Sequence, residues 1–122
     1  MNDCESFLNN EVTELIKSNY PNFNVKISKY SYGDDEAADI NFTLYLVPKD
    51  LKSYQYKLIE ISAANLDNDF PALVKRFNIK NMDRYYAADK KKFEQHILNL
   101  LVDNKTKKVA ERVLEAAASY KE

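Results

Sequence analysis

The chain is 122 residues long, 45% hydrophobic and nearly neutral, with 18 basic and 19 acidic residues. This length fits one domain with a single core, and the share of apolar and aromatic residues excludes an intrinsically disordered chain. One histidine, one cysteine and one glycine supply few of the bases, thiolates and phosphate-binding turns of most enzymes, so catalysis is not the expected role.

The beginning of the chain has no basic region followed by an apolar run, and no stretch approaches the roughly 18 consecutive apolar residues of a membrane span. The lone Cys4 cannot form a disulfide within the chain, which agrees with a reducing compartment. We therefore expect a cytoplasmic protein that has no membrane partner.

Residues 2–21 are expected to form an amphipathic helix, because apolar residues recur in them every three or four positions. Asn2 or Asp3 can cap its first turn, and Pro21 ends it. The residues that share its apolar face are Leu8, Val12, Leu15 and Ile16.

Three strands are expected next, over residues 24–32, 39–47 and 54–63, because these segments alternate or are rich in β-forming residues. The alternation is cleanest in residues 39–47, which we expect to be the central strand with Phe42 and Leu44 buried. The apolar phase slips within residues 54–63, which indicates a bulge or burial on both faces. In the first two strands, the residues expected to point inward are Val25, Ile27, Ile40, Phe42, Leu44 and Leu46, and those expected on the opposite face are Tyr30, Tyr32, Asn41, Thr43, Tyr45 and Val47.

The remainder of the chain has helical periodicity. Asp69 as a cap and Pro71 in the first turn predict a short helix over residues 70–77. Two apolar stripes within residues 89–120 are out of phase by about 160° at roughly 100° per residue. They predict two antiparallel helices with a break near Asn104.

The expected fold is therefore a single α+β domain spanning residues 1–122. It begins with a helix, continues as a three-stranded antiparallel β-meander, and ends with two or three helices packed on the sheet. The short connections between the strands are hairpins, which place consecutive strands side by side and antiparallel.

The tyrosines of the strands are the first candidate binding residues. Tyr30, Tyr32 and Tyr45 should share one face of the sheet, and Tyr54 and Tyr56 can join them if the third strand permits. Tyrosine offers a large amphipathic contact area with few rotatable bonds, so an exposed cluster favours a protein interface. The alternative is that the C-terminal helices cover this face and the tyrosines belong to the edge of the core.

The loop between the first two strands contains the second candidate, the acidic residues Asp34, Asp35 and Glu36. Together with the tyrosines, this loop predicts an interaction module that binds a protein, and an inhibitor or immunity-type partner of a basic protein fits the pattern. The loop, followed by Asp39, is also rich in oxygen ligands for Mg²⁺ or Ca²⁺, but it has no established ligand spacing. No metal and no cofactor is therefore expected.

A nucleic-acid-binding adaptor is the first alternative function. Residues 75–92 combine seven basic residues with Tyr85 and Tyr86, and basic charge with interleaved aromatic rings is one pattern of such proteins. The sequence pI near 5.9 argues against it, because domains of this kind are usually strongly basic.

Two further patterns would belong to an enzyme. Glu60, in the middle of a strand, could serve a metal-dependent hydrolase together with the acidic loop. His96 and Cys4 lie far apart along the chain, and no neighbouring feature indicates a catalytic dyad. We expect His96 on the surface or at the boundary of a helix, and Cys4 as a small apolar residue in the first helical turn.

Overall fold

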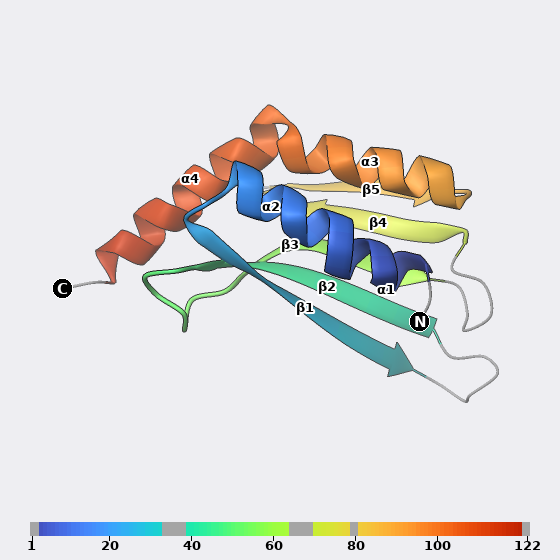
Figure 1. Ribbon diagram of the computed structural model, residues 1–122, viewed down its shortest axis with the longest axis horizontal. Helices are drawn as coiled ribbons and strands as arrows, with labels where there is room; N and C mark the ends of the chain where they lie inside the picture. The colour runs from blue at the N-terminus through green and yellow to red at the C-terminus, as the bar shows by residue number, and fades with distance from the viewer. Residues whose placement is uncertain (1–2, 33–38, 64–69, 79–80, 121–122) are drawn as a thin grey trace.

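The structure is a computed structural model, which describes residues 3–32, 39–63, 70–78 and 81–120. Five antiparallel strands form one sheet in the order of the chain, and the helices lie together on one face of it (Figure 1). The α+β class is therefore confirmed, with five strands in place of the expected three. The strands are β1 (Phe23–Tyr32), β2 (Asp39–Pro48), β3 (Tyr56–Ala63), β4 (Ala72–Phe77) and β5 (Met82–Ala87).

The expected N-terminal helix is confirmed, and it has one irregular turn in its middle. The hydroxyl of Thr13 donates to the carbonyl of Leu8 at 2.9 Å, where this turn of π-helix meets regular α-helix. Leu8, Val12 and Ile16 are fully buried in the core. The consecutive segments of the helix are α1 (Asp3–Phe7), η1 (Leu8–Val12) and α2 (Thr13–Asn19).

Strand β2 lies between β1 and β3 and has the alternating burial that its sequence predicts. Phe42 and Leu44 are each 1% exposed, which confirms their expected burial. The central strand, however, is β3, because β4 and β5 add two strands beyond it. A register shift between Leu44 and Tyr45 forms the expected bulge, and Leu58 and Ile59 of β3 are both fully buried there.

The prediction of a short helix over residues 70–77 is wrong. Most of this segment forms β4, with Ala72, Val74 and Arg76 buried on the helix-covered face, and β5 pairs with it as a hairpin. A helix this short is marginal in water, whereas the strand gains backbone hydrogen bonds from β3 and β5 on its two sides. Tertiary pairing therefore decides the structure of this segment.

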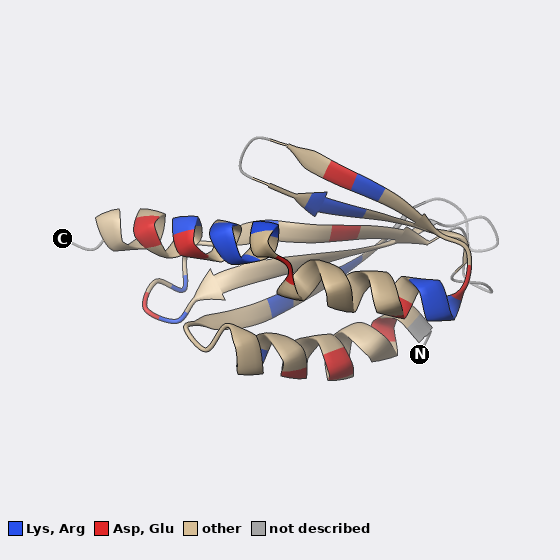
Figure 2. Ribbon diagram, turned by 90° about the horizontal axis from the view of Figure 1, so that it is seen from above, with Lys and Arg blue, Asp and Glu red and all other residues tan. Residues whose placement is uncertain are grey.

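The C-terminal helices are α3 (Lys90–Val102) and α4 (Asn104–Ser119). The break expected near Asn104 is confirmed, because Asp103 is extended, with φ −76° and ψ 168°, and its side chain accepts a hydrogen bond from the Thr106 backbone at 2.8 Å. The antiparallel arrangement is wrong, because α4 runs on from the end of α3 along the sheet (Figure 1, Figure 2). One non-helical residue is too short to fold a helix back along its predecessor.

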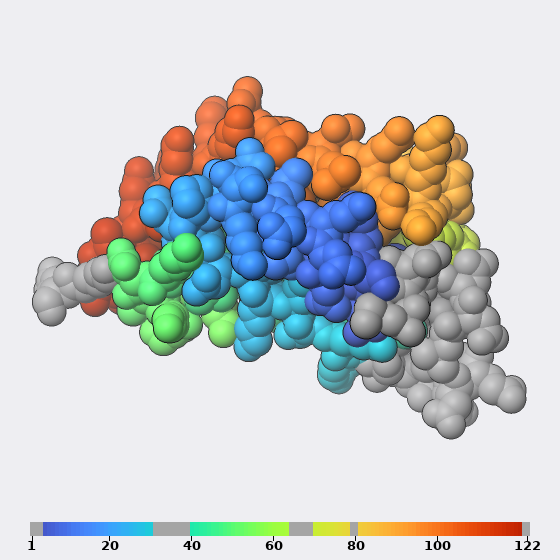
Figure 3. Space-filling view, in the orientation of Figure 1, coloured from blue at the N-terminus to red at the C-terminus, as the bar shows by residue number. Residues whose placement is uncertain are grey.

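The N-terminal helix and the α3–α4 pair pack side by side over the sheet (Figure 3). The hydroxyl of Tyr20, just beyond α2, donates to the carbonyl of Leu101 near the end of α3. Phe7 and Phe93 meet edge to face, with ring centroids 5.7 Å apart. None of the helices in the described part of the chain is long and apolar enough to cross a bilayer. The helix layer thus closes the core on one face of the sheet.

Replacing Leu44 by alanine is expected to lower the free energy of unfolding by about 2–5 kcal/mol, because the change removes apolar volume from a closely packed site. Urea denaturation followed by circular dichroism measures the loss. The control is Asn24→Ala on the exposed side of β1, where a change within about 0.5 kcal/mol is expected. Equal unfolding midpoints for the two variants would contradict the burial of Leu44.

Candidate functional site

The face of the sheet opposite the helices is the candidate site, and we call it the open face (Figure 1). Strand alternation and the register of the five strands decide which side chains belong to it. Its described residues are Asn24, Lys26, Ser28, Tyr30, Asn41, Thr43, Tyr45, Val47, Lys57, Glu60, Ser62, Leu73, Lys75, Phe77, Met82, Arg84 and Tyr86.

Tyr30 and Tyr45 lie on the open face, on the neighbouring strands β1 and β2. Tyr30 is 57% exposed, and Tyr45 is half-buried with the Lys26 ammonium 5.9 Å from the centre of its ring. The C-terminal helices therefore do not cover these two tyrosines. The described part of the chain does not include the side chain of Tyr32 or the loop residues Asp34, Asp35 and Glu36.

Tyr54 and Tyr56 do not join this cluster. Tyr54 precedes β3 and packs against Tyr120 beyond α4, with ring centroids 5.9 Å apart, and the Tyr56 hydroxyl donates to the Phe77 carbonyl at 3.0 Å. A third tyrosine of the open face is instead Tyr86 of β5, which is 72% exposed. The sequence analysis names Tyr86 only within the basic segment of residues 75–92 and not with the tyrosines of the sheet, although two adjacent tyrosines favour a strand.

The two most exposed tyrosines of the open face end one row across the sheet. Register pairs lead from Tyr30 through Asn41, Ser62 and Leu73 to Tyr86, a span of about 19 Å at roughly 4.8 Å per strand. In the middle of the row, the Ser62 hydroxyl donates to the Asn41 side chain at 2.5 Å. The rings of Tyr30 and Tyr86 therefore lie at the two ends of this row, with shorter side chains between them.

The described part of the open face is basic. Lys26, Lys57, Lys75 and Arg84 outnumber the acidic residues that the register places on this face, Asp39 and Glu60. The Glu60 carboxylate lies 3.6 Å from the ammonium of Lys57 and 3.7 Å from that of Lys75. Such partly exposed ion pairs add little stability, but they leave a surplus of positive charge among the rings.

The surroundings of Glu60 do not favour a metal site, because two ammonium groups compete with any cation for its carboxylate. Within the ranges that the structure describes, no three histidine, cysteine, aspartate or glutamate side chains gather so that they could hold a metal ion. The acidic loop that the hydrolase hypothesis also needs lies beyond those ranges. The described geometry therefore does not support that hypothesis.

The basic segment expected over residues 75–92 is not one continuous surface. Alternation directs Lys75 and Arg84 to the open face and Arg76 to the core, and the lysines that follow begin α3. A nucleic acid could therefore meet only part of this segment at one time.

Arg76 joins the hairpin of β4 and β5 to the helix layer. Its side chain is 3% exposed, and its guanidinium donates to the carboxylates of Asp83 on β5 and Asp103 at the α3–α4 junction. It also donates to the Thr106 hydroxyl at 3.3 Å. The edge of the open face that carries Tyr86 is thereby fixed to the helices on the opposite side.

Both carboxylates around Arg76 are kept charged. The hydrogen bond from Arg76 is the main cause that holds the pKa of Asp83 below its ordinary value. Burial acts to raise the pKa of Asp103, but hydrogen bonds from Arg76 and the Thr106 backbone outweigh it, and the pKa is lowered. A buried guanidinium requires such partners.

The surroundings of His96 and Cys4 indicate that both side chains serve packing. The ring of His96 stacks on Tyr85 of β5, with centroids 3.7 Å apart. Burial lowers the pKa of His96, and the positive charge of Arg76 lowers it further. Cys4 is fully buried in the apolar core cluster. The structure thus places His96 against a strand and Cys4 in the core, each in a packing position.

The described residues assemble one candidate site, the open face with Tyr30, Tyr45 and Tyr86 among basic side chains. No family model, curated protein or solved structure matches this chain. What the site binds is therefore a matter of its own geometry and charge.

Replacing Arg76 by methionine is expected to lower the free energy of unfolding by more than about 2 kcal/mol, because two carboxylates lose their buried partner. Lys75→Met is the matched control on the same strand, and there the loss of a partly exposed ion pair should cost less than about 1 kcal/mol. Urea denaturation compares the two variants. Similar losses would show that the Arg76 network does not hold the hairpin.

Acidification from about pH 7.5 to about pH 5 is expected to destabilise the fold through His96. Because the pKa of His96 is lowered in the folded state, stability present above its ordinary value of 6.5 is lost as the pH falls toward the folded pKa. His96→Phe keeps an aromatic ring against Tyr85 and removes the titration, so its urea midpoint should change less over this range. An identical pH dependence of the urea midpoint in both proteins would contradict His96 as the cause of the destabilisation.

Proposed function

We propose that this chain is a small protein-interaction module that binds its partner through the open face, in the manner of an inhibitor or immunity-type protein. The observation that supports this most is the exposure of Tyr30 and Tyr86 on a sheet face that no described helix covers. Tyrosine rings provide apolar contact area while their hydroxyls keep polar partners, and they are enriched among residues that carry binding energy. The sheet behind them supplies a rigid support.

The charge of the open face favours a partner with an acidic surface. Lys26, Lys57, Lys75 and Arg84 outnumber Asp39 and Glu60 on it, and complementary charge speeds association and excludes wrong partners. The basic partner expected from the sequence depends on the acidic loop, which the described residues do not include. For the open face we therefore propose an acidic protein.

Single-stranded nucleic acid is the second candidate, because rings among basic side chains also suit stacked bases and phosphates. The sequence pI near 5.9 argues against this candidate, because domains that bind nucleic acid are usually strongly basic. A protein partner is therefore proposed first.

We also propose a cytoplasmic location. Its support is the lone Cys4, which is buried and has no second cysteine within the chain with which to form a disulfide.

Replacing Tyr86 by serine is expected to weaken binding of the partner by more than about 1 kcal/mol, because exposed tyrosine rings are enriched among the residues that carry most of the energy of an interface. The partner is captured from extracts of the native host, purified, and titrated by calorimetry. The control is Val102→Ser, since Val102 is 40% exposed but lies at the end of α3, in the helix layer on the opposite side of the sheet.

Equal affinities for Tyr86→Ser, Val102→Ser and the unaltered chain would reject the open face as the binding site. A single-stranded oligonucleotide that binds with steep salt dependence and loses affinity in Tyr86→Ser would instead support the nucleic-acid adaptor.

A further inference from the structure

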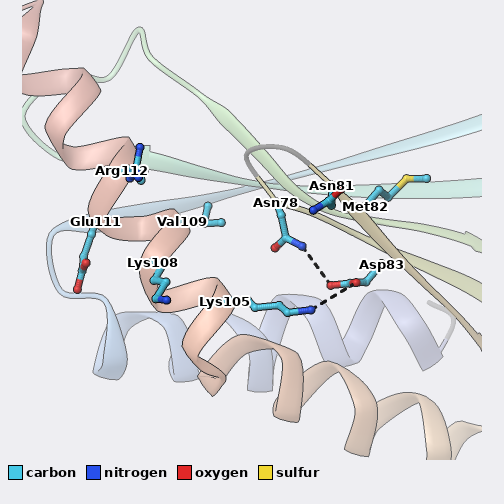
Figure 4. A pocket seen from close by; sticks show the side chains of 9 residues that line it. All are labelled: Asn78, Asn81, Met82, Asp83, Lys105, Lys108, Val109, Glu111 and Arg112. Atoms are coloured by element: carbon cyan, nitrogen blue, oxygen red, sulfur yellow. Dashed lines mark hydrogen bonds and ion pairs between the residues drawn. The ribbon is translucent and has the colours of Figure 1, made fainter.

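A groove runs between α4 and the end of the β4–β5 hairpin, and Figure 4 shows one part of it. The last residue pair between β3 and β4 at this end is Ile59 with Arg76, and the groove lies beyond it. Two adjoining hollows of about 750 and 800 Å³ make up the groove, and Asn78 and Arg112 line both of them. Volumes of this size are typical of ligand sites.

The half of the groove nearer β3 is aromatic. Tyr54, Tyr56 and Phe77 line it together with Val113 of α4. An apolar side chain of a ligand would gain burial among these groups. The Lys57 ammonium lies 5.0 Å from the centre of the Phe77 ring, and both residues also belong to the open face. The groove and the open face therefore adjoin each other.

In the other half of the groove, the basic residues Lys105, Lys108 and Arg112 outnumber the acidic residues Asp83 and Glu111. Lys108 and Arg112 lie one helical turn apart and line this half, and neither forms an ion pair with another described residue. Lys105 differs, because its ammonium lies 3.8 Å from the Asp83 carboxylate (Figure 4). Lys108 and Arg112 can thus receive carboxylates of a ligand.

Asn78, between the two halves, offers an unused acceptor. Its side-chain amide nitrogen donates to Asp83 at 3.3 Å, and this bond fixes the orientation of the amide. The Oδ1 atom is buried and accepts no hydrogen bond within the described part of the chain. An unsatisfied buried acceptor is costly, so a ligand that brings an N–H group to it gains affinity.

We propose that the groove binds a short acidic peptide segment of the protein partner. An aromatic or large aliphatic side chain of the segment lies in the aromatic half, its carboxylates lie beside Lys108 and Arg112, and a backbone N–H donates to Asn78. Glu111 and Glu115 also line the groove, so the carboxylates of the segment have to lie next to Lys108 and Arg112. This inference rests on the proposed function in that the partner is a protein, and it extends the interface from the open face to α4.

The probe is a fluorescein-labelled, glutamate-rich peptide with one central phenylalanine, titrated into the full chain and followed by fluorescence anisotropy. Arg112→Glu is expected to weaken binding by at least about tenfold, because charge reversal turns attraction into repulsion. Arg112→Lys should keep most of the affinity. Lys17→Glu reverses a charge on α2 outside the groove, where the side chain is 66% exposed, and should bind like the unaltered chain.

Two control peptides test the chemistry of the two halves. Serine in place of phenylalanine should weaken binding, and glutamine in place of glutamate should abolish it. Equal binding by Arg112→Glu and the unaltered chain, or by the glutamate and glutamine peptides, would overturn the proposal. An oligonucleotide that displaces the peptide with the same dependence on Arg112 would assign the groove to nucleic acid instead.

Tyr86→Ser separates this inference from the proposed function. The variant should bind the peptide normally, because Tyr86 does not line the groove, while its affinity for the captured partner falls. If peptide binding depends on Arg112 but partner binding does not depend on Tyr86, the groove is supported as a peptide site and the open face is rejected. If partner binding depends on Tyr86 but peptide binding does not depend on Arg112, the open face is supported as the binding site and the groove is rejected.

Discussion

The rest of the structure depends on the buried guanidinium of Arg76, which meets two carboxylates from different parts of the chain. An arginine that is only 3% exposed is tolerated only where hydrogen bonds and opposite charges replace water. Asp83 belongs to β5 and Asp103 to the α3–α4 junction, so strand pairing and helix packing are satisfied at one place. The hairpin and the helix layer therefore keep one relative position, which directional bonds specify more strictly than apolar contact does.

The orientation of Arg76 also decides what the two candidate surfaces contain. Because Arg76 points inward, its neighbours Lys75 and Phe77 point to the open face, and Phe77 at the end of β4 also lines the groove. The open face and the groove are thus two sides of one hairpin. A shift of this hairpin relative to α4 would change both surfaces together, so their geometry is coupled through the core.

Sequence patterns were sufficient where an element carries its own signal, as in the alternation of β2 and the break at Asp103. They failed for β4, because a charged residue occupies the inward position of Arg76, and the carboxylates that satisfy it lie 7 and 27 residues away. Periodicity likewise placed Tyr30 and Tyr45 on one face. Tyr86 joins their face only through pairings across the whole sheet, and no local pattern reports such pairings.

The order of the strands has a consequence for how the chain folds. Every strand pairs with the one before it, so the sheet forms from hairpins between near neighbours, which need little loop-closure entropy and favour rapid folding. The hydrogen bond from Tyr20 to Leu101 is of another kind, because it joins residues 81 positions apart. The first helix leaves the ribosome before any strand, but its hydrogen bond to α3 can form only after most of the chain has been synthesised.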